Sequence, residues 1–176
     1  MQLIFFVEGY RDELLIKYVA EHVFEVNVKI IIKKYANEKI DKIDKYLKFL
    51  NKNSYRYFLL ADFDSNSHPC ITNRKSSLSK KFKNLDPKYV IIVKEEIESW
   101  YLAGTVNVLK KKKNIKYKGI EKISKEVFYK NFKPNNMTEI EFLTSLLQKF
   151  SIEEAKKQSV TFNYLIDRIN KIKNLE

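Results

Sequence analysis

Residues Leu3–Val7 read LIFFV and run directly into Glu8; residues Tyr55–Ala61 read YRYFLLA and run directly into Asp62, with Asp64 two positions on. Continuous apolar runs that end at a polar or turn residue are typical of strands buried on both faces of a parallel sheet. We therefore predict that these two runs are the first and third strands of one sheet.

The segments around the two runs alternate between helical and strand patterns. Apolar spacing predicts helices over Asp12–Phe24, Glu38–Leu50 and Glu95–Leu102, and β-branched content predicts strands over Val26–Ile32 and Lys88–Val93. Ser65–Lys83 is polar and is expected to form a loop and a short helix. This order predicts an α/β, Rossmann-like fold with a mainly parallel four-stranded sheet, helices on both faces and right-handed crossovers.

The C-terminal part of the chain has a different pattern. Thr105–Lys118 is basic and is expected to lie on the surface, and helices are predicted over Thr138–Phe150 and Ile152–Ile172. Thr138 has the spacing of a capping box with Glu141. We expect residues 1–105 to form the α/β core and residues 106–176 to pack on the same domain, although the apolar helix faces could also form a homodimer contact.

The composition suggests a polyanionic partner without requiring one. The chain has 176 residues, 44% hydrophobic, and a net charge of +12, which suits one globular domain that binds nucleic acid. The alternative is the lysine-rich composition of an AT-rich genome. The densest basic run contains Lys110, Lys111, Lys112 and Lys113, which would contact phosphates or form a solvated face.

Several classes of protein are disfavoured. No apolar run approaches the ~20 residues of a membrane span, and the first residues do not resemble a secretion signal. Cys70 is the only cysteine, which excludes an intramolecular disulfide and a cysteine-zinc cluster. A cytoplasmic protein without membrane contact is expected.

Three carboxylates are predicted to meet at one edge of the sheet. Sites in parallel sheets form beyond the carboxyl ends of strands, and in the strand order 2-1-3-4 strands one and three are neighbours, ~5 Å apart. Glu8 would then lie beside Asp62 and Asp64. Because clustered carboxylates repel one another, a hard cation such as Mg²⁺ or Mn²⁺ would stabilise them. The alternative is that they are ordinary strand-end and helix-cap acids.

These motifs resemble the Toprim superfamily, whose pattern is a glutamate after the first strand and Asp-x-Asp after the third. The chain is most similar to stand-alone Toprim-like proteins and to the Toprim domain of the overcoming-lysogenization-defect (OLD) nucleases. Their Glu-Gly-x-x-Asp motif corresponds to Glu8, Gly9 and Asp12. Their Glu-Ile-Glu-x-Trp segment is found at Glu96–Trp100, which singles out Glu98, although Glu98 could also be a solvated helix acid.

The resemblance implies a metal-dependent phosphodiesterase or nuclease. Its catalytic residues would be Glu8, Asp62 and Asp64, with Asp12 and Glu98 as further metal ligands and Mg²⁺ or Mn²⁺ as cofactor. Ser65, Arg74 and Lys75 would bind phosphate; the alternative for the last two is a solvated loop. His68 could reach the site or be an exposed loop histidine.

Two other functions stay open. One is a nucleic-acid-binding or assembly module with a vestigial site, and the other is a phosphoryl-transfer enzyme acting on small phosphates. The chain lacks room for the extra domains of topoisomerases and primases, which favours a nuclease. It also lacks a Gly-x-x-x-x-Gly-Lys-Ser/Thr loop, so an ATPase would have to come from another chain. DNA or RNA preference, strandedness and pathway do not follow from the sequence.

Overall fold

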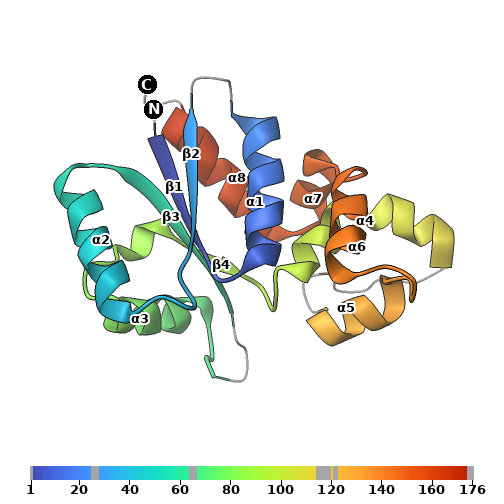
Figure 1. Cartoon of the computed structure of the whole chain (residues 1–176), viewed down its shortest axis with the longest axis horizontal. Helices are drawn as coiled ribbons and strands as arrows, with labels where there is room; N and C mark the ends of the chain where they lie inside the picture. The colour runs from blue at the N-terminus through green and yellow to red at the C-terminus, as the bar shows by residue number, and fades with distance from the viewer. Residues whose placement is uncertain (1, 25–27, 64–66, 114–119, 121–122, 174–176) are drawn as a thin grey trace. The chain divides into compact units, whose positions relative to one another are not determined.

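A four-stranded parallel sheet with strand order β2-β1-β3-β4 organises the first half of the chain (Figure 1). The computed structural model describes residues 2–24, 28–63, 67–113, 120 and 123–173, with side chains omitted for 110–113. The strands are β1 (Gln2–Val7), β2 (Lys29–Lys34), β3 (Arg56–Asp62) and β4 (Val90–Val93). The predicted α/β fold class is therefore confirmed.

The central position of β1 follows from its composition. Residues Leu3–Val7 are all buried, as expected for a strand with a neighbour on each side and helices on both faces. β1 pairs in parallel with β2, from Gln2 opposite Lys29 onward, and with β3, from Leu3 opposite Arg56 to Phe6 opposite Leu59. The carboxyl ends of β1 and β3 consequently lie side by side.

Helices cover both faces of this sheet within the unit that ends at Ile92. Figure 1 shows α1 (Tyr10–Val23) on one side, and α2 (Ile40–Lys52) and α3 (Ile71–Lys81) on the other. A short 3-10 helix, η1 (Pro87–Tyr89), precedes β4. Alternate β1 residues divide between the faces, so Ile4 and Phe6 join a core with Leu47 of α2 and Leu78 of α3.

A second compact unit begins at Val93 and is helical. Its first helix, α4 (Glu98–Lys113), extends well beyond the predicted Glu95–Leu102. The expectation that residues from Thr105 onward form a surface segment was wrong for the start of that range, because Thr105 and Val106 are buried in α4. Trp100 is fully buried, and its indole Nε1 donates to Thr161 Oγ1 at 2.9 Å. How residues 106–176 pack on the α/β core remains a prediction.

The helices α6, α7 and α8 confirm one prediction and correct another. α6 (Glu139–Leu147) starts at the predicted capping box, where the Glu141 carboxylate accepts from the Thr138 N–H at 2.7 Å. The predicted helix Ile152–Ile172 is two helices, α7 (Ile152–Gln158) and α8 (Val160–Lys173). The chain breaks there because the buried Ser159 hydroxyl accepts from the Phe162 N–H and caps α8.

One helix was not predicted at all. α5 (Lys125–Phe132) begins at Ser124, whose hydroxyl accepts from the Val127 N–H. The helix has only eight residues and follows a basic stretch, so its apolar pattern is short. None of the described helices is long and apolar enough to cross a membrane.

Candidate acidic site

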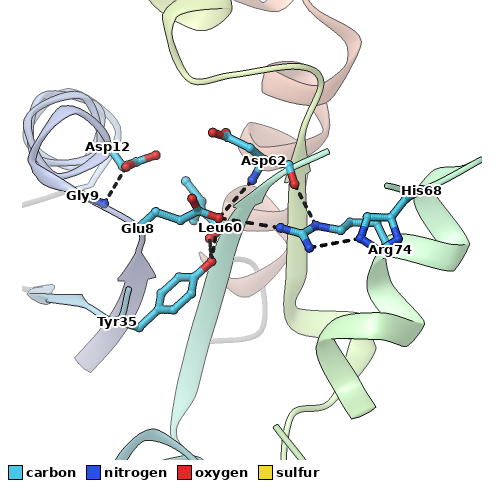
Figure 2. A network of polar contacts seen from close by, with 8 residues as sticks. All are labelled: Glu8, Gly9, Asp12, Tyr35, Leu60, Asp62, His68 and Arg74. Atoms are coloured by element: carbon cyan, nitrogen blue, oxygen red, sulfur yellow. Dashed lines mark hydrogen bonds and ion pairs between the residues drawn. The ribbon is translucent and has the colours of Figure 1, made fainter. Parts of the chain in front are cut away.

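Glu8 and Asp62 come together at the carboxyl ends of β1 and β3. Glu8 follows the last residue of β1, and Asp62 is the last residue of β3. The Asp62 main-chain N–H donates to Glu8 Oε1 at 3.4 Å (Figure 2). The neighbouring parallel strands thus place these two acids at one edge of the sheet, where ligands bind in open α/β folds.

Tyr35 orients the Glu8 carboxylate from the neighbouring strand. It follows β2, and its hydroxyl lies 3.1 Å from Glu8 Oε1 and 2.9 Å from the Leu60 carbonyl oxygen, donating toward both. Burial, together with the Glu8 charge, raises the pKa of the Tyr35 phenol well above its usual value. The phenol therefore stays protonated and acts as a donor. Tyr35 was not predicted from the sequence, although its place beyond the carboxyl end of a strand next to β1 was a usable signal.

Arg74 brings a positive charge to the same edge. This residue of α3 donates from Nε to the Asp62 carbonyl oxygen at 2.9 Å, and its Nη2 lies 3.9 Å from Glu8 Oε1. Its side chain is only 18% exposed, so this guanidinium is not the solvated loop cation that was the alternative. Arg74 partly neutralises the acidic edge.

His68 lies against the outer side of that guanidinium. Its Nε2 is 3.2 Å from Arg74 Nη1, and its Nδ1 is 3.1 Å from Asn73 Oδ1. Because a guanidinium can only donate, His68 Nε2 accepts and Nδ1 carries the hydrogen given to Asn73. His68 thus reaches the site through Arg74 (Figure 2).

Asp12 supports the turn from β1 into α1. Its Oδ2 accepts from the Gly9 N–H at 2.9 Å, and the residue is 6% exposed. Burial raises the pKa of this carboxyl to about 6; the Gly9 hydrogen bond opposes the rise, and the Glu8 charge adds to it. Asp12, in the first turn of α1, therefore interacts electrostatically with Glu8.

All described donors to Glu8 converge on one of its two oxygens. Tyr35, the Asp62 N–H and Arg74 each approach Oε1. Within the described part of the chain, this arrangement leaves Oε2 available to a cation. Carboxylate oxygens are the ligands that Mg²⁺ and Mn²⁺ prefer. Among the residues that the structure describes, however, no group of three or more His, Cys, Asp or Glu side chains is placed to hold a metal ion.

The structure describes only some of the other predicted site residues. Asp64 and Ser65 lie outside the described residues, as do the side chains of Lys110, Lys111, Lys112 and Lys113. Lys75 follows Arg74 on α3 and is half-buried. Glu98 begins α4 in the second unit and is 2% exposed, so it is not a solvated helix acid.

Comparison with known proteins gives one likeness, at the level of the fold. No protein-family model matches the chain. No curated protein matches it either. Among solved structures it is similar to the C-terminal region of the Burkholderia pseudomallei OLD protein, with a TM-score of 0.44 and 13% sequence identity over 92% of this chain and 87% of that one. At this identity the likeness concerns the arrangement of helices and strands, not the site.

Proposed function

We propose that the chain is a Mg²⁺- or Mn²⁺-dependent phosphodiesterase that cleaves nucleic acid, with Glu8, Asp62 and Asp64 as its catalytic residues. The observation that carries this proposal is the meeting of Glu8 and Asp62 at the carboxyl ends of two neighbouring parallel strands. Carboxylates at that edge are in the position where an α/β sheet binds its ligand.

Each residue of the site has a definable part in such a reaction. Asp62 and Asp64 would bind the cation directly, and Glu8 would bind it through Oε2 or accept a proton from the attacking water. A bound divalent cation would supply a phosphate clamp and a water of lowered pKa. Asp12, with its carboxyl pKa of about 6, is mostly ionised at neutral pH and would offer a carboxylate to a second cation. Glu98 is proposed as a further ligand.

Cationic side chains would hold the substrate. Arg74 already lies at the acidic edge, where its guanidinium can donate to a phosphate oxygen and stabilise charge that develops on it. Ser65 and Lys75 are proposed as further phosphate contacts, and Lys110, Lys111, Lys112 and Lys113 as sequence-independent contacts to the backbone of nucleic acid. The net charge of +12 agrees with a polyanionic substrate.

We also propose a cellular location and partner chains for the protein. We place it in the cytoplasm, where nucleic acid is accessible, and we expect any ATPase that assists it to be a separate chain. A homodimer built on the C-terminal helices is part of the same proposal.

The test is cleavage by the full chain of supercoiled plasmid, single-stranded DNA and RNA in Mg²⁺, Mn²⁺ or EDTA. We expect metal-dependent cleavage that is lost in Asp62→Asn/Asp64→Asn and kept in Glu38→Gln. Glu38 is a suitable control because it is a surface acid paired with Lys42 and distant in sequence from the proposed ligands. Small phosphoesters belong in the same panel, since turnover of these alone would indicate the small-phosphate alternative.

One observation favours a second candidate, a nucleic-acid-binding module with a vestigial site. The Arg74 guanidinium already provides Glu8 with a positive partner, so the charge of Glu8 is balanced in part without a metal ion. Mn²⁺ binding, measured by electron paramagnetic resonance, separates the two. Binding of DNA without binding of Mn²⁺ would favour the module and contradict the nuclease.

A further inference from the structure

A strip of stacked aromatic rings lies on α2 and the residues that follow it. The rings of Tyr46 and Phe49 have centroids 6.2 Å apart and planes within 7° of each other. Phe49 stacks in turn on Tyr55, at 5.9 Å and 25°. We call these three residues the α2 aromatic strip. Its central ring, Phe49, is 51% exposed, which is unusual for a large apolar side chain.

The strip is held in place by the core beneath it. The Tyr46 ring contacts the buried Phe6 ring edge-on, with centroids 5.8 Å apart. Tyr46 and Tyr55 are half-buried on either side of Phe49. The three rings are therefore positioned before any ligand arrives, so little side-chain entropy is lost when a flat molecule stacks on Phe49.

Lysines lie on both sides of the strip. The Lys33 ammonium stands 4.9 Å from the centre of the Tyr46 ring. Lys45 and Lys52 lie four residues before and three residues after Phe49, so helical spacing puts both on its face of α2. Both are exposed, and neither forms an ion pair with any residue that the structure describes. Their charges remain available to an anionic ligand.

We propose that the α2 aromatic strip binds single-stranded nucleic acid, with bases stacked on Phe49 and Tyr55 and phosphates held by Lys45 and Lys52. Aromatic rings with flanking cations bind single strands because every unpaired base has a π-face, whereas the bases of a duplex are already stacked. Lysine is depleted in protein interfaces, so these lysines favour nucleic acid over a protein partner. The inference rests on the proposed function for its role, since it names the substrate class; the binding itself needs no metal.

The test measures binding in EDTA by fluorescence anisotropy. The probes are a labelled oligo(dT), an oligomer of abasic sites of the same length, and a duplex. We expect the wild type to bind oligo(dT) most tightly. Phe49→Ala should weaken oligo(dT) binding by about 5- to 100-fold and leave the abasic oligomer unaffected, because one base then has no ring to stack on. Phe49→Trp should retain binding, and Tyr164→Ala, which removes an exposed ring in the other unit, should match the wild type.

The lysines have a separate readout. In Lys45→Gln/Lys52→Gln the slope of log affinity against log salt should fall by about 1.4, since each contact to a single strand contributes about 0.7. The abasic oligomer should lose affinity as well, because it retains the phosphates that Lys45 and Lys52 would bind.

Three results would overturn the inference: equal wild-type binding of oligo(dT) and abasic oligomer, a folded Phe49→Ala variant that binds oligo(dT) normally, or a wild-type dimer that Phe49→Ala dissociates without changing oligo(dT) affinity. The last would show that a second copy covers the strip. Failure of the proposed function looks different. Base-dependent binding without metal-dependent cleavage would contradict the nuclease alone, and cleavage of plasmid without base-dependent binding would contradict the strip alone.

Discussion

Arg74 Nη2 lies 3.9 Å from Glu8 Oε1, so the acidic edge of the sheet contains its own cation. The same guanidinium is tied to the Asp62 carbonyl by Nε. A cation so close to Glu8 stabilises its carboxylate and repels any metal ion that would bind it. Arg74 would therefore weaken metal binding and, at the same time, provide a cationic donor for a phosphate oxygen.

Replacing Arg74 should separate these two effects. In Arg74→Gln we expect Mn²⁺ to bind roughly tenfold more tightly, because about 1.4 kcal/mol of repulsion is removed. Cleavage should fall by about 100-fold, since the variant has no cationic donor to the developing phosphate charge. Calorimetric titration and the plasmid assay measure the two. Lys80→Gln, an exposed cation on the same helix, is the control; unchanged Mn²⁺ affinity in Arg74→Gln would contradict the competition.

The proposed metal ligands predict a metal-dependent stability. At a Mn²⁺ concentration of about 100 times its dissociation constant, the wild type should gain about 2.7 kcal/mol in its free energy of unfolding. Asp62→Asn/Asp64→Asn should gain nothing, and without metal it should be at least as stable as the wild type, because repulsion with Glu8 is reduced. Urea unfolding with and without Mn²⁺ tests this, with Asp41→Asn as the control. A variant that unfolds in the absence of metal would indicate structural acids instead.

Asp12 should impose a pH dependence on stability. Its carboxyl pKa is raised from 3.8 to about 6 by burial, so the folded state binds this proton more tightly than the unfolded state. Ionisation of the buried Asp12 carboxyl therefore lowers the free energy of unfolding. This loss of stability is absent below pH 3.8, grows between pH 3.8 and about 6, and is complete above that. Asp12→Asn, whose side-chain oxygen can still accept from Gly9, should stabilise the metal-free protein at pH 7.5 by at most about 3 kcal/mol, and by much less near pH 4.5.

Urea unfolding across that pH range measures the difference. Asp41→Asn, which removes an exposed acid of α2, is the control for the loss of a surface carboxylate. A constant gain for Asp12→Asn at every pH would show that the burial cost is not electrostatic.

We expect Gly104→Ala, a kind of substitution that normally stabilises a helix, to destabilise this protein. Alanine in place of an interior helical glycine gains about 1 kcal/mol, but a Cβ at Gly104 would overlap the Phe150 ring. Overpacking of this kind costs about 1–3 kcal/mol, so Gly104→Ala should be net destabilising. Adding Phe150→Leu should recover part of the loss, since the smaller side chain leaves space. Thermal unfolding of the single and double variants tests the contact, and additive effects would contradict it.

Local patterns were sufficient for much of the fold. The LIFFV run and the run before Asp62 identified the central strands, because a strand buried on both faces has no polar alternation. The capping box at Thr138 marked the start of α6, because it involves only residues three apart. The length of α4 could not be predicted from the sequence. Its apolar first half is followed directly by lysines, and no glycine or proline comes directly after them to mark where the helix ends.

The meeting of Glu8 and Asp62 was predicted from the sequence on the condition that the strand order is 2-1-3-4, and the structure has that order. The carboxyl ends of β1 and β3 are then neighbours, because the strands are parallel. Arg74 and His68 were named from the sequence as candidates near the site and Tyr35 was not, but the contacts of all three were found only in the tertiary structure. Tyr35, His68 and Arg74 approach the site from separate elements, and no local periodicity relates a residue of α3 to the end of β1. The positions of His68 and Arg74 depend on how α3 packs against the sheet, and that packing is decided by side chains distant in sequence. The position of Tyr35 depends on the pairing of β2 with β1.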